Sequence, residues 1–314
     1  MITLITSLFN GEKYIDFYLE NIVLCKDYDK CEHLIFNIVS SNNNYVFKIL
    51  KKYSLKHINI KVINIEKDIG LYNIWNKGIK ISKFDLISNS NIDDYITKDF
   101  LVEHYNYMIK NPKINLVCSI PKISYNIIKN TNIDTIKDEW FKQKNVKYVN
   151  NDINYVYKNT TEIENKINLY TGIISDQLCH EKYPSNIIDY LKIKKKFIEN
   201  NYYKNIWLTY DYFDLYDMIS NQNNKWITFN IPHSCLVWRK KLHTKYGYFN
   251  EKKYKKYSDY EFWLRCLSNN EIFGHINKNL YIYYQNYNSH NNKINKEDLK
   301  IKSNIIKKYY NIIL

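Results

Sequence analysis

The sequence predicts an α/β fold, in which a doubly wound and mostly parallel sheet is covered by helices on both faces. Short apolar runs alternate with amphipathic helical stretches as far as Pro121, and this alternation is typical of βαβ units. Polar turns follow the apolar runs, as expected where parallel strands end at one edge of a sheet. The 314 residues are 45% hydrophobic, which supplies the core of one large domain or two small ones.

The apolar runs predict strands at 2–9, 33–39, 58–65, 84–87 and 115–120, the last ended by Pro121. Residues at helical spacing follow the first three strands, namely Tyr14, Phe17, Tyr18 and Ile22, then Val46, Ile49, Leu50 and Tyr53, then Leu71, Ile74, Trp75, Gly78 and Ile79. We expect a fourth helix to be capped by Thr97 and to stop before Pro112.

The stretch from Phe84 to Phe100 carries the strongest chemical signal in the first half of the chain. An apolar run, short enough for a buried strand, turns abruptly into a polar segment with Asn91, Asp93 and Asp94. In open α/β sheets ligands bind at the carboxyl ends of strands, and hard oxygen groups suit a divalent cation that carries phosphates. A solvated turn with an Asx cap is the alternative interpretation. No G-x-G-x-x-G or Walker pattern occurs, so metal and side chains would have to hold any phosphates.

A second informative block spans residues 230–265. The apolar run 235–238 precedes a short helix, 239–246, that ends at Gly247. We expect Ser258 to cap a further helix that holds Asp259 and Glu261 in its first turn. The helix dipole keeps a carboxylate ionised there, which suits Asp259 to the role of a general base; a second N-terminal capping group is the alternative. A last strand at 280–284 and a basic helix at 296–314 complete the chain.

The middle of the chain carries fewer motifs, and we interpret residues 122–226 as an insertion or an acceptor-facing subdomain. Its aromatic residues could stack on sugar rings or pack in a core, and they are Trp140, Trp207, Tyr210, Tyr212 and Phe213. In the block that follows, we expect His233 and His243 to be structural hydrogen-bonding groups, and Arg239 and Arg265 to be buried salt-bridge partners.

The net charge of +14, from 46 basic and 32 acidic residues, favours anionic partners such as nucleotides, nucleic acid or a membrane face. Asn, Ile, Lys and Tyr abound while Gly occurs 6 times and Pro 4 times, which we interpret as codon drift in an AT-rich genome. A basic, Tyr-rich nucleic-acid-binding module is therefore an alternative function. The dispersal of the lysines and the lack of OB-like or RRM-like patterns argue against it.

The six cysteines form no C-x-x-C pair, so we expect reduced, mostly buried thiols in a cytoplasmic protein and no structural zinc site. The first residues lack basic groups ahead of a short apolar run, so they predict a strand and not a signal peptide. No apolar stretch approaches the roughly 20 residues that span a membrane.

Taken together, these segments resemble the inverting glycosyltransferases of family 2, which have the GT-A fold. The opening T-S-L-F-N-G-E-K-Y-I is similar to that family's first strand and turn. D-I-G-L-Y-N-I-W-N-K-G-I followed by N-S-N-I-D-D resembles the nucleotide-sugar segment of one subgroup, and P-H-S-C-L-V-W-R through S-D-Y-E-F-W-L-R resembles its acceptor-side segment. The resemblance covers about residues 1–121 and 227–289, and it rests on the order and spacing of four motifs.

The resemblance implies a role for each matching residue. Asn91-Ile92-Asp93 takes the place of the family's D-x-D, so Asp93 would bind the Mn²⁺ or Mg²⁺ ion that bridges the donor diphosphate. Asp259 would deprotonate the acceptor hydroxyl, and the donor would be a nucleoside-diphosphate sugar, UDP-linked by analogy with the family. The implied donor-binding residues are Thr6, Asn10, Ser40, Asp68, Asn76, Asn91 and Asp94.

The sequence departs from the family pattern in three places. Ser40 and Ser41 replace an acidic turn, Asn91 replaces the first D-x-D aspartate, and Ser258 replaces a glutamate before the base. A catalytically inactive GT-A scaffold is therefore a further alternative. The expected division is 1–121 for the donor half, 122–226 for the insertion, 227–290 for the acceptor half and 291–314 for the terminal helix. The acceptor would be a glycan or glycoconjugate, with no nucleic-acid partner, and both a homodimer and a peripheral membrane contact stay open.

Overall fold

A computed structural model describes residues 1–124, 235–284, 297–298, 300–301, 304–305 and 308–309. The expected insertion, its aromatic residues and His233 lie outside these residues. The strands are β1 (Ile2–Leu8), β2 (Glu32–Ile38), β3 (Ile60–Ile65), β4 (Leu86–Asn89), β5 (Tyr95–Ile96), β6 (Ile114–Ser124), β7 (Val237–Arg239) and β8 (Ile272–Tyr284). The helices are α1 (Ile15–Ile22), α2 (Asn44–Lys56), α3 (Leu71–Ile81), α4 (Phe100–Lys110), α9 (Lys241–Tyr246), α10 (Glu251–Tyr254) and α11 (Ser258–Leu267).

The strands form one eight-stranded sheet in the order β3-β2-β1-β4-β7-β6-β8-β5. β7 is antiparallel to both of its neighbours and β5 is antiparallel to β8, whereas the other pairs are parallel. The predicted α/β class with a mostly parallel sheet is therefore confirmed. The described residues between 297 and 309 are helical, in agreement with the predicted terminal helix.

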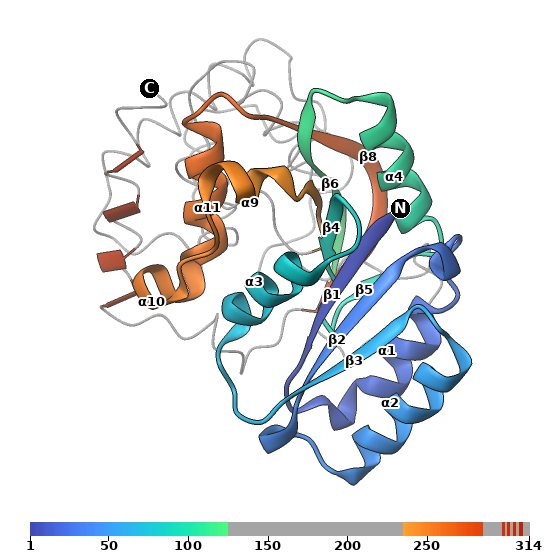
Figure 1. Ribbon diagram of the computed structural model, residues 1–314. Helices are drawn as coiled ribbons and strands as arrows, with labels where there is room; N and C mark the ends of the chain where they lie inside the picture. Colours follow the sequence, from blue (N-terminus) through green and yellow to red (C-terminus); the bar gives the residue numbers. More distant parts are fainter. Residues whose placement is uncertain (125–234, 285–296, 299, 302–303, 306–307, 310–314) are drawn as a thin grey trace, which may run out of the picture.

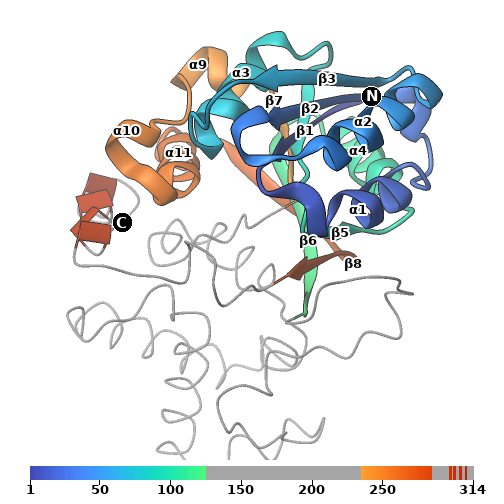
Figure 2. The ribbon, with the colours of Figure 1, turned by 90° about the horizontal axis from the view of Figure 1, so that it is seen from below.

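Helices cover both faces of the sheet, and two hydrophobic cores lie between the layers. α1, α2 and α4 pack on one face, and α3, α9 and α11 pack on the other (Figure 1). Figure 2 shows the same grouping from below, with α9, α10 and α11 together beside α3. Because side chains alternate along a strand, Leu4 of β1 enters one core and Ile5 the other. Gly78 lets α3 approach β1 closely, since a Cβ there would lie 2.8 Å from Ile5 Cδ1.

The chain reverses its direction across the sheet at β1. From β1 it proceeds to β2 and β3 on one side, and it then returns to place β4 on the other side of β1. Ligands of open α/β sheets bind outside the carboxyl ends of the strands at such a switch point. The turn after β1 and the turn after β4, which contains Asp93, both lie there.

Two local predictions were wrong because pairing with β8 overrides them. Thr97 does not cap α4: Asp99 holds the N-cap position, and neither side chain caps the helix. The N–H of Thr97 instead bonds the Leu280 carbonyl of β8 at 2.9 Å, which holds Thr97 in the strand-like segment before the helix. Pro121 does not end β6, because β6 continues to Ser124 beside β8 with a register shift between Ile120 and Pro121.

None of the helices within the described residues is long and apolar enough to cross a membrane. Cys25, Cys31 and Cys266 are buried thiols outside any disulfide, as expected for reduced cysteines.

The hydroxyl of Thr97 is buried and has no hydrogen-bond partner, so its removal should stabilise the fold. We expect Thr97→Val to raise the free energy of unfolding by about 1 kcal/mol, because the mutation removes an unsatisfied polar group at nearly constant shape. Thr3→Val is the matched control: Thr3 Oγ1 donates to Glu32 and accepts from the N–H of Phe84. That control should lose about 1–2 kcal/mol. Urea unfolding would measure both, and equal losses would contradict the prediction.

Candidate active site

The turn that follows β4 places two carboxylates at the switch point, and its own hydrogen bonds fix its shape. Ser90 donates its N–H to the Ile5 carbonyl of β1 at 3.0 Å. Asp94 accepts from the Asn91 amide at 2.9 Å and, through its other oxygen, from the N–H of Tyr284 at 3.1 Å. Since Asp94 is buried and both oxygens are engaged, its carboxylate joins this turn to the end of β8.

Asp93 lies in the same turn, beside two tyrosine side chains. Burial raises the pKa of Asp93 to about 6. Burial together with the charge of Asp93 raises the pKa of Tyr14 and of Tyr284, so both phenols lie near this carboxylate. The centroids of these two rings are 6.3 Å apart. A cation would favour the ionised form of Asp93, which burial disfavours.

A buried polar network supports the turn from below. The hydroxyl of Tyr18 lies 2.6 Å from Thr6 Oγ1 and donates to Ser90 Oγ at 3.0 Å. His33 Nε2 is 3.0 Å from Thr6 Oγ1, and His33 Nδ1 is 2.7 Å from the Tyr28 hydroxyl. Burial lowers the pKa of His33 to about 3, so the ring stays neutral. Thr6, an expected donor-binding residue, is thus fully buried beneath the edge and supports Ser90.

Carboxamides join the ends of β1 and β2 where the family resemblance implies an acidic turn. Asn42 Oδ1 accepts the N–H of Gly11 at 2.8 Å, and Asn42 Nδ2 donates to Asn37 Oδ1 at 2.9 Å. Asn10 and Ser40 lie on this edge and are exposed. Both are therefore accessible to a ligand, and their expected contact with the donor stays a prediction.

The first turn of α3 is bound by a carboxylate from a distant part of the chain. The side chain of Glu251, at the start of α10, accepts the N–H of Asn73 at 3.0 Å and lies near the N–H groups of Leu71 and Tyr72. Gly70 has a φ of +90°, and a Cβ there would lie 2.4 Å from the Glu251 carboxylate, so only glycine suits this position. Asp68 is exposed and accepts the N–H of Gly70 at 2.8 Å, which shapes the turn before the helix.

Asn76 extends the same contact one turn further along α3. Its Nδ2 donates to the Phe249 carbonyl at 2.8 Å and its Oδ1 accepts the Phe249 N–H at 3.1 Å. The amide expected to bind the donor is thus engaged with the backbone of Phe249. The ring of Phe249 packs among other aromatic rings from α3, α11 and their neighbours, namely Tyr72, Trp75, Trp238, His243, Phe262 and Trp263.

These contacts lead directly to Asp259. The hydroxyl of Tyr72 donates a hydrogen bond to Asp259 Oδ1 at 2.8 Å, and Asp259 lies in the first turn of α11. Ser258 does not cap α11, contrary to the prediction: it is the first helical residue, and its hydroxyl donates to the Lys255 carbonyl at 2.6 Å. Ser258 is completely buried, and Tyr257 occupies the N-cap position.

The structure brings Asp93 and Asp259 to the same edge of the sheet. Asp93 follows β4, and Asp259 contacts the start of α3, which follows β3. β3 and β4 run in the same direction on either side of β2 and β1. Figure 1 shows the starts of α3 and α11 close together at this edge.

A family model described as "Glycosyl transferase family 2" matches residues 3–165, just over half of this chain. The chain belongs to glycosyl transferase family 2. The expected family and enzyme class are thereby confirmed, and the matched range contains the turn with Asp93 but not Asp259.

Solved structures with the same fold support the GT-A architecture of this family 2 chain. S. aureus TarS 1-349 in complex with UDP is 15% identical with a TM-score of 0.54, and the match covers 98% of this chain and 64% of that one. The UDP-GlcNAc complex of TarS 1-349 gives 14% identity and a TM-score of 0.54, with 99% and 72% covered. Mannosyltransferase PcManGT from Pyrobaculum calidifontis, in complex with GDP-Man and Mn²⁺, is 9% identical with a TM-score of 0.50, and the match covers 90% of this chain and 56% of that one. At such identities the likeness concerns the fold.

One curated protein also matches: "Protein Ycf2" of Physcomitrium patens is 30% identical over 258 residues. The alignment covers 75% of this chain and 10% of that protein, so the family 2 chain spans about a tenth of that relative.

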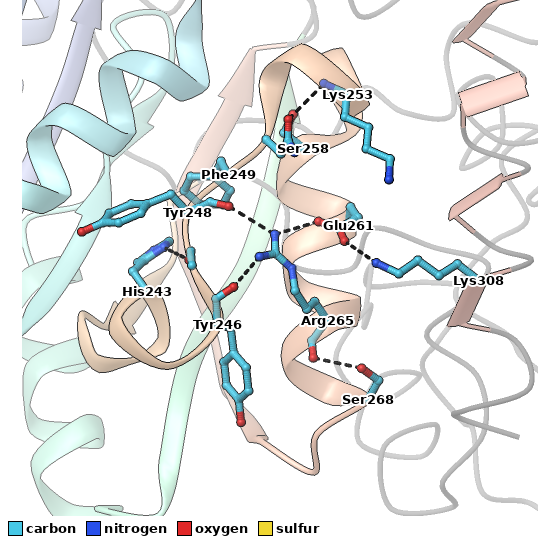
Figure 3. Close-up of polar contacts among 12 residues, drawn as sticks. His243, Tyr246, Tyr248, Phe249, Lys253, Ser258, Glu261, Arg265, Ser268 and Lys308 are labelled. Atoms are coloured by element: carbon cyan, nitrogen blue, oxygen red, sulfur yellow. Dashed lines mark hydrogen bonds and ion pairs between the residues drawn. The ribbon is translucent and has the colours of Figure 1, made fainter.

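A buried carboxylate, Glu261, joins α11 of this family 2 chain to the terminal helix. It was not identified as a functional group from the sequence. Glu261 is fully buried and accepts from Arg265 at 2.8 Å, from Lys308 at 3.1 Å and from the Tyr309 hydroxyl at 2.6 Å. Figure 3 shows Arg265 and Lys308 on either side of it. Arg265 also donates to the carbonyls of Tyr246 and Tyr248. The i,i+4 spacing of Glu261 and Arg265 is the sequence signal for this pair.

His243 and Arg239 of the family 2 chain are engaged with neighbouring protein groups. Trp238 Nε1 donates to His243 Nε2 at 2.9 Å, and His243 Nδ1 lies 3.2 Å from the Gly247 carbonyl. Arg239 donates to the carbonyls of Ile114 and Met108 at 2.9 and 2.8 Å. Arg265 therefore has the expected salt bridge, whereas Arg239 binds backbone carbonyls.

Loss of Arg265 should destabilise the fold, because it leaves part of the buried charge of Glu261 uncompensated. We expect Arg265→Met to lower the free energy of unfolding by about 3 kcal/mol. Lys30→Met is the control, since Lys30 and Asp27 pair at 2.7 Å with side chains that are 59% and 52% exposed. Because exposed ion pairs contribute little to stability, this control should cost far less than Arg265→Met. Urea unfolding would compare the two, and similar small losses would show that Glu261 does not depend on Arg265.

Proposed function

We propose that this chain is a metal-dependent, inverting glycosyltransferase that moves a sugar from a nucleoside-diphosphate sugar to a hydroxyl of a glycan or glycoconjugate. The observation that supports this most is the pair of carboxylates at the carboxyl edge of the sheet. Asp93 lies at the switch point, and Asp259 is held against the first turn of α3. In this proposal Asp93 binds the cation and Asp259 is the base.

The residues at the switch point fit a divalent cation that arrives with a nucleotide. Within the described residues, no three His, Cys, Asp or Glu side chains gather into a cage for a metal. Mg²⁺ in nucleotide sites is commonly bound by one or two carboxylates together with substrate phosphates, so Asp93 alone can supply the protein ligand. Asp94 would act by holding the turn, because Asn91 and Tyr284 engage its oxygens.

The proposed reaction needs one protein carboxylate at the acceptor. When bound, the cation stabilises the negative charge of the departing diphosphate. Asp259 removes the proton of the acceptor hydroxyl, whose oxygen attacks the anomeric carbon from the face opposite to the diphosphate, and the configuration inverts. Glycoside hydrolysis differs because it commonly uses two carboxylates, one of which protonates the leaving group.

The proposed donor residues divide into two groups. Asn10 and Ser40 are exposed at the edge, so we propose that they contact the nucleotide, with Asn91 beside the donor sugar. Thr6, Asp68 and Asn76 are engaged with neighbouring protein groups, and we propose that they position the site. A UDP-linked donor is the first choice, because TarS 1-349 has been solved with UDP and UDP-GlcNAc. The buried thiols fit a reaction in the reducing cytoplasm.

Thermal unfolding with UDP, GDP, dTDP and ADP, each with and without Mn²⁺, tests this proposal. A nucleotide at about 100 times its dissociation constant adds about 2.7 kcal/mol to the free energy of unfolding. We expect stabilisation by one nucleotide, dependent on Mn²⁺ and lost in Asp93→Asn. Asp85→Asn is the matched control, because Asp85 is an exposed carboxylate at the opposite end of β4, and it should retain the full shift.

Transfer then tests the base. We expect Asp259→Asn to retain the nucleotide-dependent shift and to lose sugar transfer, as for a residue that acts in the chemical step. The absence of stabilisation by any nucleotide in the wild type would contradict the proposal and favour an inactive scaffold. Binding to DNA with a steep salt dependence would favour the nucleic-acid-binding alternative.

A further inference from the structure

Tyr72 connects α3 to the proposed base and is held firmly in place. Its side chain is 6% exposed. The ring packs edge-on against Trp75, with centroids 5.2 Å apart, and at a tilt against Phe249, with centroids 5.6 Å apart. Its hydroxyl oxygen lies 2.8 Å from Asp259 Oδ1 and 2.9 Å from the carbonyl oxygen of Lys256. The hydroxyl therefore has two acceptors within reach.

A phenol carries a single hydrogen, so the two acceptors compete for it. A hydrogen bond to an ionised carboxylate is about twice as strong as one to a neutral carbonyl, which directs the hydrogen to Asp259 while that residue is charged. Burial and the charge of Asp259 raise the pKa of Tyr72 well above its ordinary value, so the phenol remains a donor. Once Asp259 is neutral, the Lys256 carbonyl becomes a comparable acceptor.

We propose that Tyr72 is a positioning residue for Asp259: its hydroxyl fixes Oδ1 while the carboxylate is ionised, and turns to the Lys256 carbonyl when Asp259 takes up the acceptor's proton. This inference rests on the proposed function. In that reaction the acceptor oxygen forms the bond to the anomeric carbon, the bond from that carbon to the diphosphate oxygen breaks, and its electron pair leaves with the diphosphate. The acceptor's proton moves to Asp259, and the buried phenol keeps a partner before and after this step.

Three ionisable groups in the described segments near Asp259 have partners of their own, which the loss of this hydroxyl leaves in place. On α10, the Glu251 carboxylate accepts the N–H of Asn73 of α3. Before α11, the Lys256 ammonium pairs with Asp298 of the terminal helix at 2.9 Å. Tyr257 lies near that same carboxylate, since burial and Asp298 raise its pKa. A change in the titration of Asp259 on removal of the hydroxyl would thus report the hydroxyl itself.

Tyr72→Phe removes the hydroxyl and keeps the ring, so it tests the inference. With aspartate carboxyls labelled with ¹³C, NMR titration would follow Asp259, whose signal is the one absent in Asp259→Asn. We expect the midpoint of Asp259 to rise by about one pH unit in Tyr72→Phe, because the ionised form loses a donor. Tyr45→Phe is the matched control: the Tyr45 hydroxyl donates to Asp16 at 2.5 Å on the exposed surface, and its loss should leave Asp259 unchanged. An unchanged Asp259 midpoint in Tyr72→Phe would overturn the inference.

The kinetic counterpart uses UDP release from UDP-GlcNAc with Mn²⁺ and water as acceptor. Because the base must be ionised, we expect the acidic limb of kcat to move to higher pH in Tyr72→Phe, by about one unit. At a fixed acidic pH, kcat should fall by about tenfold, with the donor KM unchanged within about twofold. A fall in kcat with an unmoved acidic limb would indicate a structural role and overturn the inference.

The two proposals fail in distinguishable ways. If Asp259→Asn releases UDP at the wild-type rate, Asp259 is not the base, and both the proposed role and this inference are wrong. If Asp259→Asn is inactive while the Asp259 midpoint and the acidic limb are unchanged in Tyr72→Phe, only the inference is wrong. If the wild type releases no UDP, the proposed activity fails for this donor, and the NMR titration still decides whether Tyr72 stabilises the ionised carboxylate.

Discussion

The arrangement of the site depends on the contact between the amino end of α3 and the segment that carries Asp259. A helix begins with N–H groups that have no partner inside the helix, and here the carboxylate of Glu251 accepts the N–H of Asn73 and lies near two others. The same helix binds the backbone of Phe249 through Asn76 and Asp259 through Tyr72. The segment that carries the proposed base is therefore fixed by the position at which α3 begins, which in turn follows from the end of β3 and the turn at Gly70.

The opposite side of the site is fixed by burial. Beneath the turn that contains Asp93, hydrogen bonds link four buried residues to one another, namely Thr6, Tyr18, His33 and Ser90. Buried polar networks of this kind are rigid when each member has a partner. The neutral state of His33 keeps the network free of charge. The turn thus holds Asp93, whose ionised form a bound cation would stabilise in the proposed site, while both oxygens of Asp94 accept hydrogen bonds that hold the turn. Two adjacent residues of the same type thereby have different surroundings, and the proposed site gives them different roles.

The sequence predicted the layers of the fold well, because the periods of helices and strands are local properties that survive packing. Local signals failed where tertiary pairing competes, as at Thr97 and Pro121 beside β8. The resemblance assigned roles to Asp93 and Asp259, and these roles stay predictions. Burial decides which polar residues can contact a ligand, and the sequence did not reveal that Thr6 is buried or that Asn76 is engaged with the backbone of Phe249. The contacts of Asn76 with Phe249 and of Tyr72 with Asp259 join residues 173 and 187 positions apart, and no spacing in one sequence reveals such pairs.

The neutral residues at the edge have a consequence for the proposed chemistry. Ser40, Asn42 and Asn91 offer hydrogen bonds without the negative charge that acidic residues would place beside a diphosphate. Fewer carboxylates reduce repulsion of the donor, but they also leave the cation with fewer protein ligands. The cation must then obtain its remaining ligands from the nucleotide's phosphates. Since coupling between two ligands is reciprocal, the nucleotide strengthens binding of the cation as much as the cation strengthens binding of the nucleotide. A site with one free carboxylate of this kind would bind the two together far better than it binds either one alone.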